Sequence, residues 1–287
     1  MGMKALSHYW FRLLLLCCSL LTPAGAAQAA DLLEAEQAFR FSARMKDAQT
    51  IEVRYDIARG YYMYRDNFRF AVEGAQLGAP KIPPGKKKFD SNFQKTMETH
   101  RDSVVILLPV QGASGPLQLK STSQGCADAG VCYPPTTQSA TLSLNAEKPQ
   151  SSPAPKPAGG SPFVKPTGAS GFTRIASSSE LDGSLQGAGR ITMLDFYADW
   201  CGPCKQMERL TFSDARVKQK MASLVLLQAD VTRNNEDDRV LLKRFKLVGP
   251  PGILFFDRNG REITALRVIG YQAPEKFLQT LEQAARS

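Results

Sequence analysis

Four cysteines in two close pairs are the residues of this chain with the clearest potential for chemistry. Cys201 and Cys204 enclose Gly-Pro within a Trp-Cys-Gly-Pro-Cys run that directly follows an apolar, strand-like segment. Cys126 and Cys132 are separated by five residues and lie in a region of different composition. The other two of the six cysteines belong to an N-terminal apolar run that we expect to be removed. Two dithiols on two domains suggest that electrons pass from one pair to the other.

The pair Cys201 and Cys204 has the spacing of a dithiol that exchanges with disulfides. A dithiol reductant needs one exposed, partly ionised thiol and a second thiol close behind it. We expect a helix to begin at Cys201, because unpaired N–H groups and the helix dipole would stabilise a thiolate there. Cys204 would follow nearly one turn later. Cys201 is therefore the predicted nucleophile, and Cys204 the thiol that resolves a mixed disulfide.

Three residues near this pair could tune its chemistry. Asp195, six residues before Cys201 on an apolar strand, is either a buried carboxyl that exchanges a proton with Cys204 or a surface-facing residue. Glu208 lies one helical turn beyond Cys204 and could act on the same thiol, although a solvated helix residue has the same pattern. Pro251 ends a Gly-Pro-Pro turn, where a cis peptide bond could face the dithiol.

The pair Cys126 and Cys132 allows two interpretations. It lies in the loop Gln-Gly-Cys-Ala-Asp-Ala-Gly-Val-Cys-Tyr-Pro-Pro between two expected strands. A disulfide there could simply close a short loop in a secreted β domain. It could instead be a reactive disulfide, which would need shielding from stray oxidants. The spacing alone leaves both interpretations open.

Metal binding and nucleic-acid binding are two other functions to consider. As half of a zinc site, Cys201 and Cys204 would need two further ligands, and the mature chain offers only His100 and a cysteine pair of the wrong spacing. The formal charge of +9 is partly local, in the lysines at 86–88, and no nucleic-acid motif accompanies it. We therefore predict no metal, no nucleic-acid partner and no cofactor besides the redox-active disulfides.

Residues 1–30 have the pattern of a secretory signal peptide. Lys4 and Arg12 supply a positive start, Leu13–Leu21 an apolar core, and Ala27–Ala29 a small-x-small cleavage site. The core is well short of the ~20 residues that span a bilayer as a helix, and no later stretch approaches that length. Export permits disulfides, so the signal and the cysteine usage together favour a bacterial periplasm. We expect the mature protein to be soluble, since no later stretch is long enough to span a membrane, and we expect a monomer.

A change in composition divides the mature chain into two domains. Residues 146–171 are rich in Pro, Ser, Gly, Ala and Lys. Such a stretch cannot bury enough apolar surface to order itself, so we predict a linker. It separates residues 31–145 from residues 172–287, and each of these segments is large enough for one core.

The first segment has the pattern of an all-β domain. Residues 51–57 alternate apolar and polar side chains, as a half-buried strand does. Further short strands are expected at Phe68–Val72, Val104–Val110, Leu117–Ser121 and Ala140–Leu144. No sustained helical stripe interrupts them, so a small antiparallel sandwich fits best.

The second segment alternates strands and helices. Strands are expected at residues 191–197 and 224–231, each followed by a helix. The remaining signals are helix caps at Ser213 and at Asn234 or Asn235, a hairpin of Gly252–Asp257 with Ala265–Gly270 around Asn259-Gly260, and a last helix opened by Pro274. This order predicts an α/β thioredoxin-like domain.

Longer motifs around both pairs are similar to one known family. Gln124–Pro135, together with Gly60–Arg65, closely resembles the N-terminal periplasmic domain of the DsbD family of thiol:disulfide interchange proteins. Leu194–Cys201, Thr211–Asp214 and Ile253–Asp257 resemble the C-terminal thioredoxin-like domain of that family. The motifs occur in the order of the family and cover nearly all of the mature chain except the linker.

For the first domain, the resemblance implies an immunoglobulin-like sandwich with a redox-active pair. Cys132, rather than Cys126, is the implied point of attack for both donor and client. Phe93 matches the aromatic tip of the loop that caps this pair in the family. Tyr62 and Tyr64 match tyrosines that line the same site.

For the second domain, the resemblance places functions on three residues already considered. Asp195 and Glu208 fall on the acidic pair that tunes the dithiol, and Pro251 falls on the cis-proline. One departure lies next to it: Pro250 has no N–H to pair with the backbone of a partner, so one docking hydrogen bond is lost.

Two further departures concern the first domain and the linker. Ser91 and Asn92 stand where two acidic residues are expected before the cap aromatic. The 26 linker residues take the place of a multi-helix membrane domain. A flexible linker of that length spans roughly 28 Å, so the two domains could meet, at an effective concentration on the order of millimolar.

The leading hypothesis is a periplasmic protein-disulfide reductase. Electrons would pass from Cys201/Cys204 to Cys126/Cys132 and then to client disulfides, a direction that follows from the resemblance. A separate membrane protein would supply the electrons, and cytochrome c maturation factors are among the clients implied. The alternatives are an oxidase or isomerase, and a catalytic thioredoxin-like domain beside a client-binding sandwich whose disulfide is structural.

Overall fold

Both predicted domains are present in the computed structural model, which describes residues 32–90, 95–113, 115–143 and 171–287. The predicted signal peptide and nearly all of the predicted linker lie outside these residues. Among the described residues, no helix is long and apolar enough to cross a membrane.

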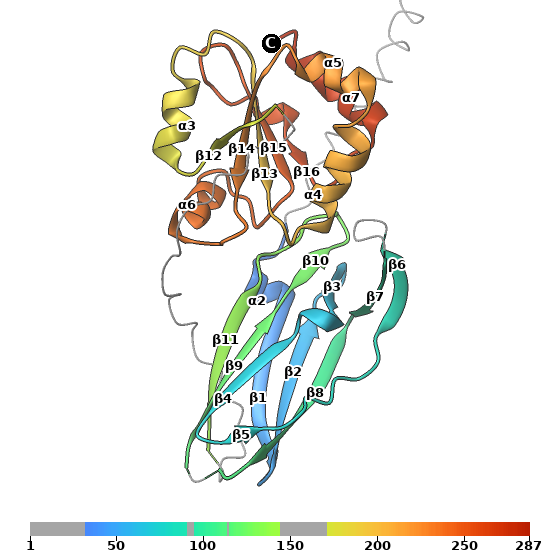
Figure 1. Cartoon of the computed structure of the whole chain (residues 1–287), viewed down its shortest axis with the longest axis vertical. Coiled ribbons are helices and arrows are strands. Elements are labelled where there is room, and N and C mark those ends of the chain that lie inside the picture. Colours follow the sequence, from blue (N-terminus) through green and yellow to red (C-terminus); the bar gives the residue numbers. More distant parts are fainter. Residues whose placement is uncertain (1–31, 91–94, 114, 144–170) are drawn as a thin grey trace, which may run out of the picture. The chain divides into compact units, whose positions relative to one another are not determined.

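Residues 32–143 form a β sandwich built from short antiparallel sheets (Figure 1). One sheet has the order β1-β2-β8-β5, with strands Phe39–Asp47, Thr50–Ile57, Ser103–Gln111 and Gln76–Leu77. A second has the order β10-β3-β7-β6, with strands Gly125–Ala127, Tyr61–Tyr64, Lys95–His100 and Lys86–Asp90. The third has the order β11-β9-β4, with strands Thr136–Leu142, Leu117–Ser123 and Arg69–Glu73. The predicted immunoglobulin-like sandwich is confirmed.

The alternation in β2 shows why the sequence forms a sandwich. Ile51, Val53 and Tyr55 are fully buried in the core between the sheets, while the residues between them are more exposed. Because successive side chains point to opposite faces, this one-sided burial produces the period of two. The Tyr55 hydroxyl is satisfied inside the core by the Ser121 hydroxyl at 2.8 Å. The apolar face of β2 therefore fixes which side of its sheet becomes the interior.

The sequence prediction of this domain was incomplete at several strands. The last strand ends at Leu142 rather than Leu144, as part of β11. Strands β1, β3, β5, β6, β7 and β10 and the short helix α2 (Ala35–Ala38) were not predicted. Two of them, β3 and β10, are only four and three residues long and show no alternation in burial, so no periodicity marks them.

Residues 171–287 form a mixed sheet with helices around it (Figure 1). The sheet has the order β12-β14-β13-β15-β16, with strands Thr173–Ile175, Val225–Asp230, Thr192–Tyr197, Gly252–Phe256 and Val268–Ile269. The helices are α3 (Ser178–Leu185), α4 (Gly202–Gln206), α5 (Ala215–Met221), α6 (Glu236–Arg244) and α7 (Pro274–Ala284). Strand β13 is parallel to β14 and antiparallel to β15. The predicted thioredoxin-like fold is confirmed, although β12 and α3 were not predicted.

The helix starts show which capping signals operate. The predicted cap at Ser213 is wrong, because the Asp214 carboxylate accepts the N–H groups of Arg216 and Val217 and so begins α5. A carboxylate can accept both hydrogen bonds and complements the positive end of the helix. Asn235 begins α6 in a capping box, as one of the two predicted alternatives.

The predicted hairpin after β15 is only partly correct. A turn at Asn259-Gly260 is present, with Gly260 at φ +76, and β15 and β16 are antiparallel. The chain between them does not return as a tight hairpin but makes a bridge of Phe256 with Glu262 and a 3₁₀ turn at Thr264–Leu266. Strand β16 is therefore limited to Val268–Ile269.

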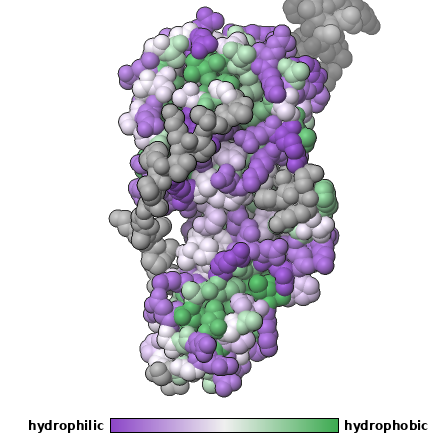
Figure 2. Space-filling view, viewed as in Figure 1, coloured by the Kyte–Doolittle hydropathy of each residue, from purple (hydrophilic) through white to green (hydrophobic). Residues whose placement is uncertain are grey.

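The two interiors are separate, and each lies next to one cysteine pair. Cys201 and Cys204 belong to the apolar cluster between the central sheet and α3 and α6, which includes Phe196 and Leu254. Cys126 and Cys132 form a small cluster of their own with Tyr64 and Met97. On the visible face, Figure 2 shows mostly hydrophilic side chains with small apolar areas between them.

Candidate active site

The pair Cys201 and Cys204 lies at the start of α4, directly after β13. The two cysteines form a disulfide. Cys201 is the N-cap residue, and its sulfur accepts the N–H of Cys204 at 3.1 Å. Pro203 occupies the first turn, where a missing N–H costs no intrahelical hydrogen bond. A thiolate on Cys201 would therefore face unpaired N–H groups at the positive end of a helix.

Both sulfurs of this pair are buried in this arrangement. Cys201 is 0% exposed and Cys204 is 3% exposed. The expected exposed thiol is thus covered, and both cysteines belong to the apolar cluster of their own domain. The Cys204 sulfur is 4.0 Å from the carbonyl oxygen of Phe196 on β13.

Asp195 is a buried carboxyl, not a surface residue. It lies in the middle of β13 and is 3% exposed. Burial raises the pKa of Asp195 to about 7; the Gln228 amide lowers it against this trend, and the charge of Glu208 raises it. A carboxyl with this pKa can both accept and release a proton near neutral pH.

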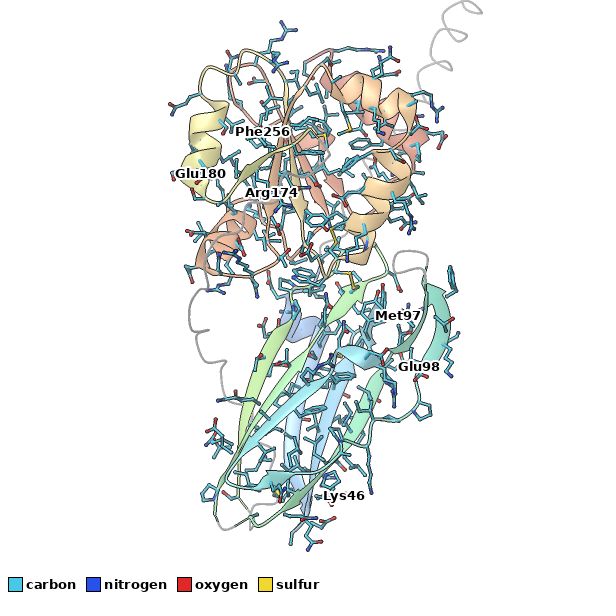
Figure 3. All side chains as sticks on the ribbon, viewed as in Figure 1. Lys46, Met97, Glu98, Arg174, Glu180 and Phe256 are labelled. Carbon is cyan, nitrogen blue, oxygen red and sulfur yellow. A yellow bond between two sulfur atoms is a disulfide. The ribbon has the colours of Figure 1, made fainter. Side chains whose placement is uncertain are left out.

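Glu208 is brought toward Asp195 by an irregular turn of helix. Residues Met207–Thr211 form a π-helical turn that continues α4. Such turns insert a residue and are frequent at functional sites. Glu208 is half-buried, and its burial raises the pKa of its carboxyl, while Arg174 on β12 lowers it. Arg174 also forms an ion pair with Asp230 at 2.8 Å (Figure 3).

The turn before β15 contains the one cis peptide bond of the described residues, between Pro250 and Pro251. The Pro251 carbonyl oxygen accepts the N–H of Gly270 at 3.0 Å, which ties the turn to the residue after β16. The Pro250 carbonyl oxygen is directed to a different element. It accepts the N–H of Cys132 at 3.0 Å.

The pair Cys126 and Cys132 also forms a disulfide, on an edge of the sandwich. Cys126 lies on β10, opposite Tyr62 of β3, and both cysteines are 0% exposed. Tyr64 and Met97 pack directly against the pair, and Tyr62 packs at the rim of this cluster.

The two tyrosines form one unit beside this disulfide. The rings of Tyr62 and Tyr64 are perpendicular at 5.4 Å, and their hydroxyls are 3.4 Å apart. The Arg101 guanidinium lies 5.1 Å from the centre of the Tyr62 ring. Met97 and Glu98 are neighbours on β7, where Met97 joins the cluster and Glu98 forms an ion pair with Arg65 at 3.2 Å (Figure 3). Phe93, the predicted cap, lies outside the described residues.

The loop that carries Cys132 is in main-chain contact with the cis-proline turn of the other domain. Leu32–Ser287 forms one unit, and within it the Cys132 N–H donates to Pro250 as described above. The Gln124 amide donates to the Trp200 carbonyl oxygen at 3.5 Å. A side chain on Gly249 would be impossible here, because its Cβ would lie 2.1 Å from the Cys132 carbonyl oxygen. One cysteine of the sandwich disulfide is therefore hydrogen-bonded to the turn that contains the cis-proline.

Comparison with known proteins assigns both domains. Residues 29–144 match the sequence profile of the family described as "Thiol:disulfide interchange protein DsbD, N-terminal". Residues 183–285 match the profile of the family described as "Thioredoxin-like domain". The chain joins a DsbD N-terminal domain to a thioredoxin-like domain.

Two relatives named "Thiol:disulfide interchange protein DsbD" illustrate the similarity. The protein from Ralstonia nicotianae is 54% identical over 114 residues, which are 39% of this chain and 19% of the relative. That from Yersinia pestis is 50% identical over 109 residues, which are 38% of this chain and 18% of the relative. The alignment therefore spans about a fifth of the length of these curated relatives.

Several of the solved structures similar to this chain come from Neisseria meningitidis. The reduced DsbD N-terminal domain is 35% identical, with a TM-score of 0.38, and the alignment covers 42% of this chain and 96% of that chain. The oxidised DsbD C-terminal domain is 31% identical, with a TM-score of 0.35, and the alignment covers 39% of this chain and 99% of that chain. A further structure is a complex of the DsbD N-terminal domain with the PilB N-terminal domain. It is 34% identical, with a TM-score of 0.35, and the alignment covers 39% of this chain and 87% of that chain.

Some residues of the two domains were not recognised from the sequence. In the thioredoxin-like domain, the buried Gln228 donates to Asp195 at 3.0 Å. In the DsbD N-terminal domain, Met97 contacts the cysteine pair. A polar residue within the apolar strand 224–231 was a usable signal for Gln228, whereas Met97 had none. Among the described residues, no group of three or more His, Cys, Asp or Glu side chains could hold a metal ion.

Proposed function

We propose that the chain is a periplasmic protein-disulfide reductase that relays electrons between its two domains. The thioredoxin-like pair Cys201/Cys204 reduces Cys126/Cys132, and the reduced sandwich then reduces client disulfides. The observation that carries this proposal is the main-chain contact between Cys132 and the cis-proline turn. A purely structural disulfide has no need to lie against the cis-proline turn of another domain.

The transfer is a sequence of two thiol–disulfide exchanges. The Cys201 thiolate attacks the Cys132 sulfur, the Cys126–Cys132 bond breaks, and Cys126 leaves as a thiolate that takes up a proton. Cys204 then attacks the Cys201 sulfur and releases the Cys132 thiolate, which also takes up a proton. Two electrons and two protons move, so that Cys201/Cys204 ends as a disulfide and Cys126/Cys132 as a dithiol.

Asp195 supplies the base for the second exchange. Cys204 must lose its proton before it attacks, and it is buried, so bulk water is a poor acceptor. A buried carboxyl with a pKa near neutrality can take this proton and return it in the next cycle. Glu208 supports this role, because its negative charge favours the protonated form of Asp195 after the transfer.

Tyr62 and Tyr64 would shield the sandwich disulfide and shape the client surface, together with Phe93 as a cap. The electron donor would be a separate membrane protein, and the clients periplasmic proteins with a reducible disulfide, including factors of cytochrome c maturation. The predicted signal peptide supports the location, and the mature protein would act as a monomer.

The direction of transfer is tested by the two reduction potentials. Full-length mature chain is equilibrated in glutathione buffers, and each dithiol is quantified by alkylation and mass spectrometry. Cys201/Cys204 is expected to have the more negative potential. If Cys126/Cys132 proves to have the more negative potential, electrons would not flow in the proposed direction when both pairs are reduced to the same extent.

The role of the sandwich pair is tested with a client. A suitable probe is the oxidised PilB N-terminal domain, because a similar DsbD N-terminal domain forms a complex with it. Cys126→Ser/Cys132→Ser is expected to abolish its reduction by the pre-reduced chain. Undiminished reduction would show that the sandwich only binds clients and that its disulfide is structural.

A further inference from the structure

Gln228 is a buried polar residue whose place in the sheet points to one partner. It lies on β14, directly opposite Asp195 in the parallel register of β13 and β14. Gln228 is 4% exposed, and its neighbours Leu227 and Ala229 belong to an apolar core. Burying an amide in such surroundings is unfavourable unless it is hydrogen-bonded. Its Nε2 donates to Asp195 Oδ2 at 3.0 Å.

This hydrogen bond has two physical consequences for Asp195. It fixes one carboxylate oxygen, and so the rotamer of a side chain that must exchange a proton with Cys204. It also stabilises the ionised form of Asp195 and so lowers its pKa, whereas burial raises that pKa. The donor is neutral, so it stabilises the carboxylate less than an ammonium group would.

Gln228 opposes the other groups that act on the pKa of Asp195. Asp195 is influenced by burial, by the Gln228 amide and by the charge of Glu208 in the π-helical turn. Burial and Glu208 both favour the protonated carboxyl. Cys204, in α4, is the thiol whose proton Asp195 accepts in the proposed function. Gln228 alone, among the groups that act on Asp195, favours its ionised form.

We propose that Gln228 is a positioning residue that sets the ionisation and orientation of Asp195, and thereby the pH range in which Cys204 resolves the mixed disulfide. This inference rests on the role of Asp195 in the proposed function. A hydrogen bond to a charged group is typically strong enough to change the pKa of that group by about one unit or more. With a pKa one unit above neutrality, the ionised fraction of Asp195 at pH 7 would fall about fivefold.

The test compares two substitutions with opposite expected effects. Gln228→Leu removes the donor and is expected to move the pKa of Asp195 up by about one unit, whereas Gln228→Lys is expected to move it down. Thr192→Val is the control, because Thr192 is on β13, fully buried, and its hydroxyl has no hydrogen-bond partner among the described residues. All variants are made in the mature chain with Cys126→Ser/Cys132→Ser, so that one dithiol remains.

Two readouts separate a role in proton transfer from a role in folding. Carbon NMR titration of the Asp195 carboxyl gives its pKa directly. Reaction of the reduced chain with an aromatic disulfide releases two equivalents of thiolate, the first on attack by Cys201 and the second when Cys204 closes the disulfide. Only the second phase is expected to change its pH midpoint, upward in Gln228→Leu and downward in Gln228→Lys.

Three outcomes would overturn the inference. The pKa of Asp195 could stay unchanged in both variants, both variants could move the midpoint in the same direction, or the pKa could move while the second phase does not follow. None of these depends on transfer to the sandwich, since Cys126 and Cys132 are absent from the assay. Failure of the relay itself would appear only in the client experiment, so the two proposals fail separately.

Discussion

Replacing Asp195 by asparagine is expected to stabilise the thioredoxin-like domain, by an amount that grows with pH. Burial raises the pKa of Asp195 from 3.8 to about 7 in the folded, disulfide-bonded chain. Between these two values the folded state keeps a proton that the unfolded state has released. The stabilisation from that proton is complete below pH 4 and is lost as the pH rises through the folded pKa.

The magnitude follows from the width of this pH window. Each pH unit in which only the folded state is protonated changes the free energy of unfolding by about 1.4 kcal/mol. A window of roughly three units therefore gives about 4 kcal/mol, an order-of-magnitude figure. The asparagine side chain has no ionisable proton, and its amide oxygen can still accept the Gln228 hydrogen bond. The variant should match the parent near pH 4 and exceed it by about 4 kcal/mol above pH 7.

The measurement is urea unfolding of the oxidised chain at several pH values between 4 and 8. Trp200 is the only tryptophan outside the predicted signal peptide, so its fluorescence reports on this domain. Asp237→Asn, at an exposed position of α6, serves as the control and should show no pH-dependent gain. A difference between Asp195→Asn and the parent that stays constant with pH would refute the reasoning, because burial would then not hold the proton on Asp195.

Three further predictions address other parts of the chain. Asn235→Ala removes the side-chain half of the capping box of α6 and should lower the free energy of unfolding by about 1 kcal/mol in urea. Burial lowers the pKa of His100 below its ordinary value of 6.5. The unfolded chain therefore binds a proton more readily, and the free energy of unfolding of the parent should fall as the pH drops below 6.5. In His100→Leu this pH-dependent fall should be smaller. Gly249→Ala should slow electron transfer between the two pairs roughly 10- to 100-fold in stopped-flow mixing, because its Cβ would overlap Cys132. Gly183→Ala, where an added Cβ meets nothing within 4 Å, should leave that transfer unchanged.

Strands with one buried face could be predicted from the sequence, and strands without one could not. In β8, as in β2, buried and more exposed residues alternate along the whole strand, so the sequence itself carries the period. The short strands β3 and β10 bring Tyr62, Tyr64 and Cys126 together. They are held by pairing with each other and by the cluster around the disulfide, and such long-range pairing leaves no local pattern.

The role of a single residue could be predicted from the sequence only where its neighbours along the chain determine that role. Asp195 could be recognised as a candidate, because a carboxyl in an apolar strand near a dithiol has few structural explanations. Its alternation with neighbouring residues did not reveal burial, since both faces of the central strand β13 are covered. At α5, the predicted cap Ser213 was wrong by one residue, because the Asp214 side chain accepts the first N–H groups of the helix. Gln228 was visible as a polar residue in an apolar strand, but its role could not be inferred, because its partner lies 33 residues away along the chain.

The two cysteine pairs are supported by different physical means, and this bears on how the relay would respond to perturbation. The environment of Cys201 and Cys204 is largely local: a helix start, the strand before it, and a buried carboxyl on that strand. The environment of Cys126 and Cys132 is long-range, since Tyr64 and Met97 come from other strands of a short edge sheet. Edge elements with few hydrogen bonds open more readily than a central sheet. Loosening of the sandwich edge would therefore expose the Cys126–Cys132 disulfide to oxidants and to clients, while the Cys201/Cys204 pair would stay intact.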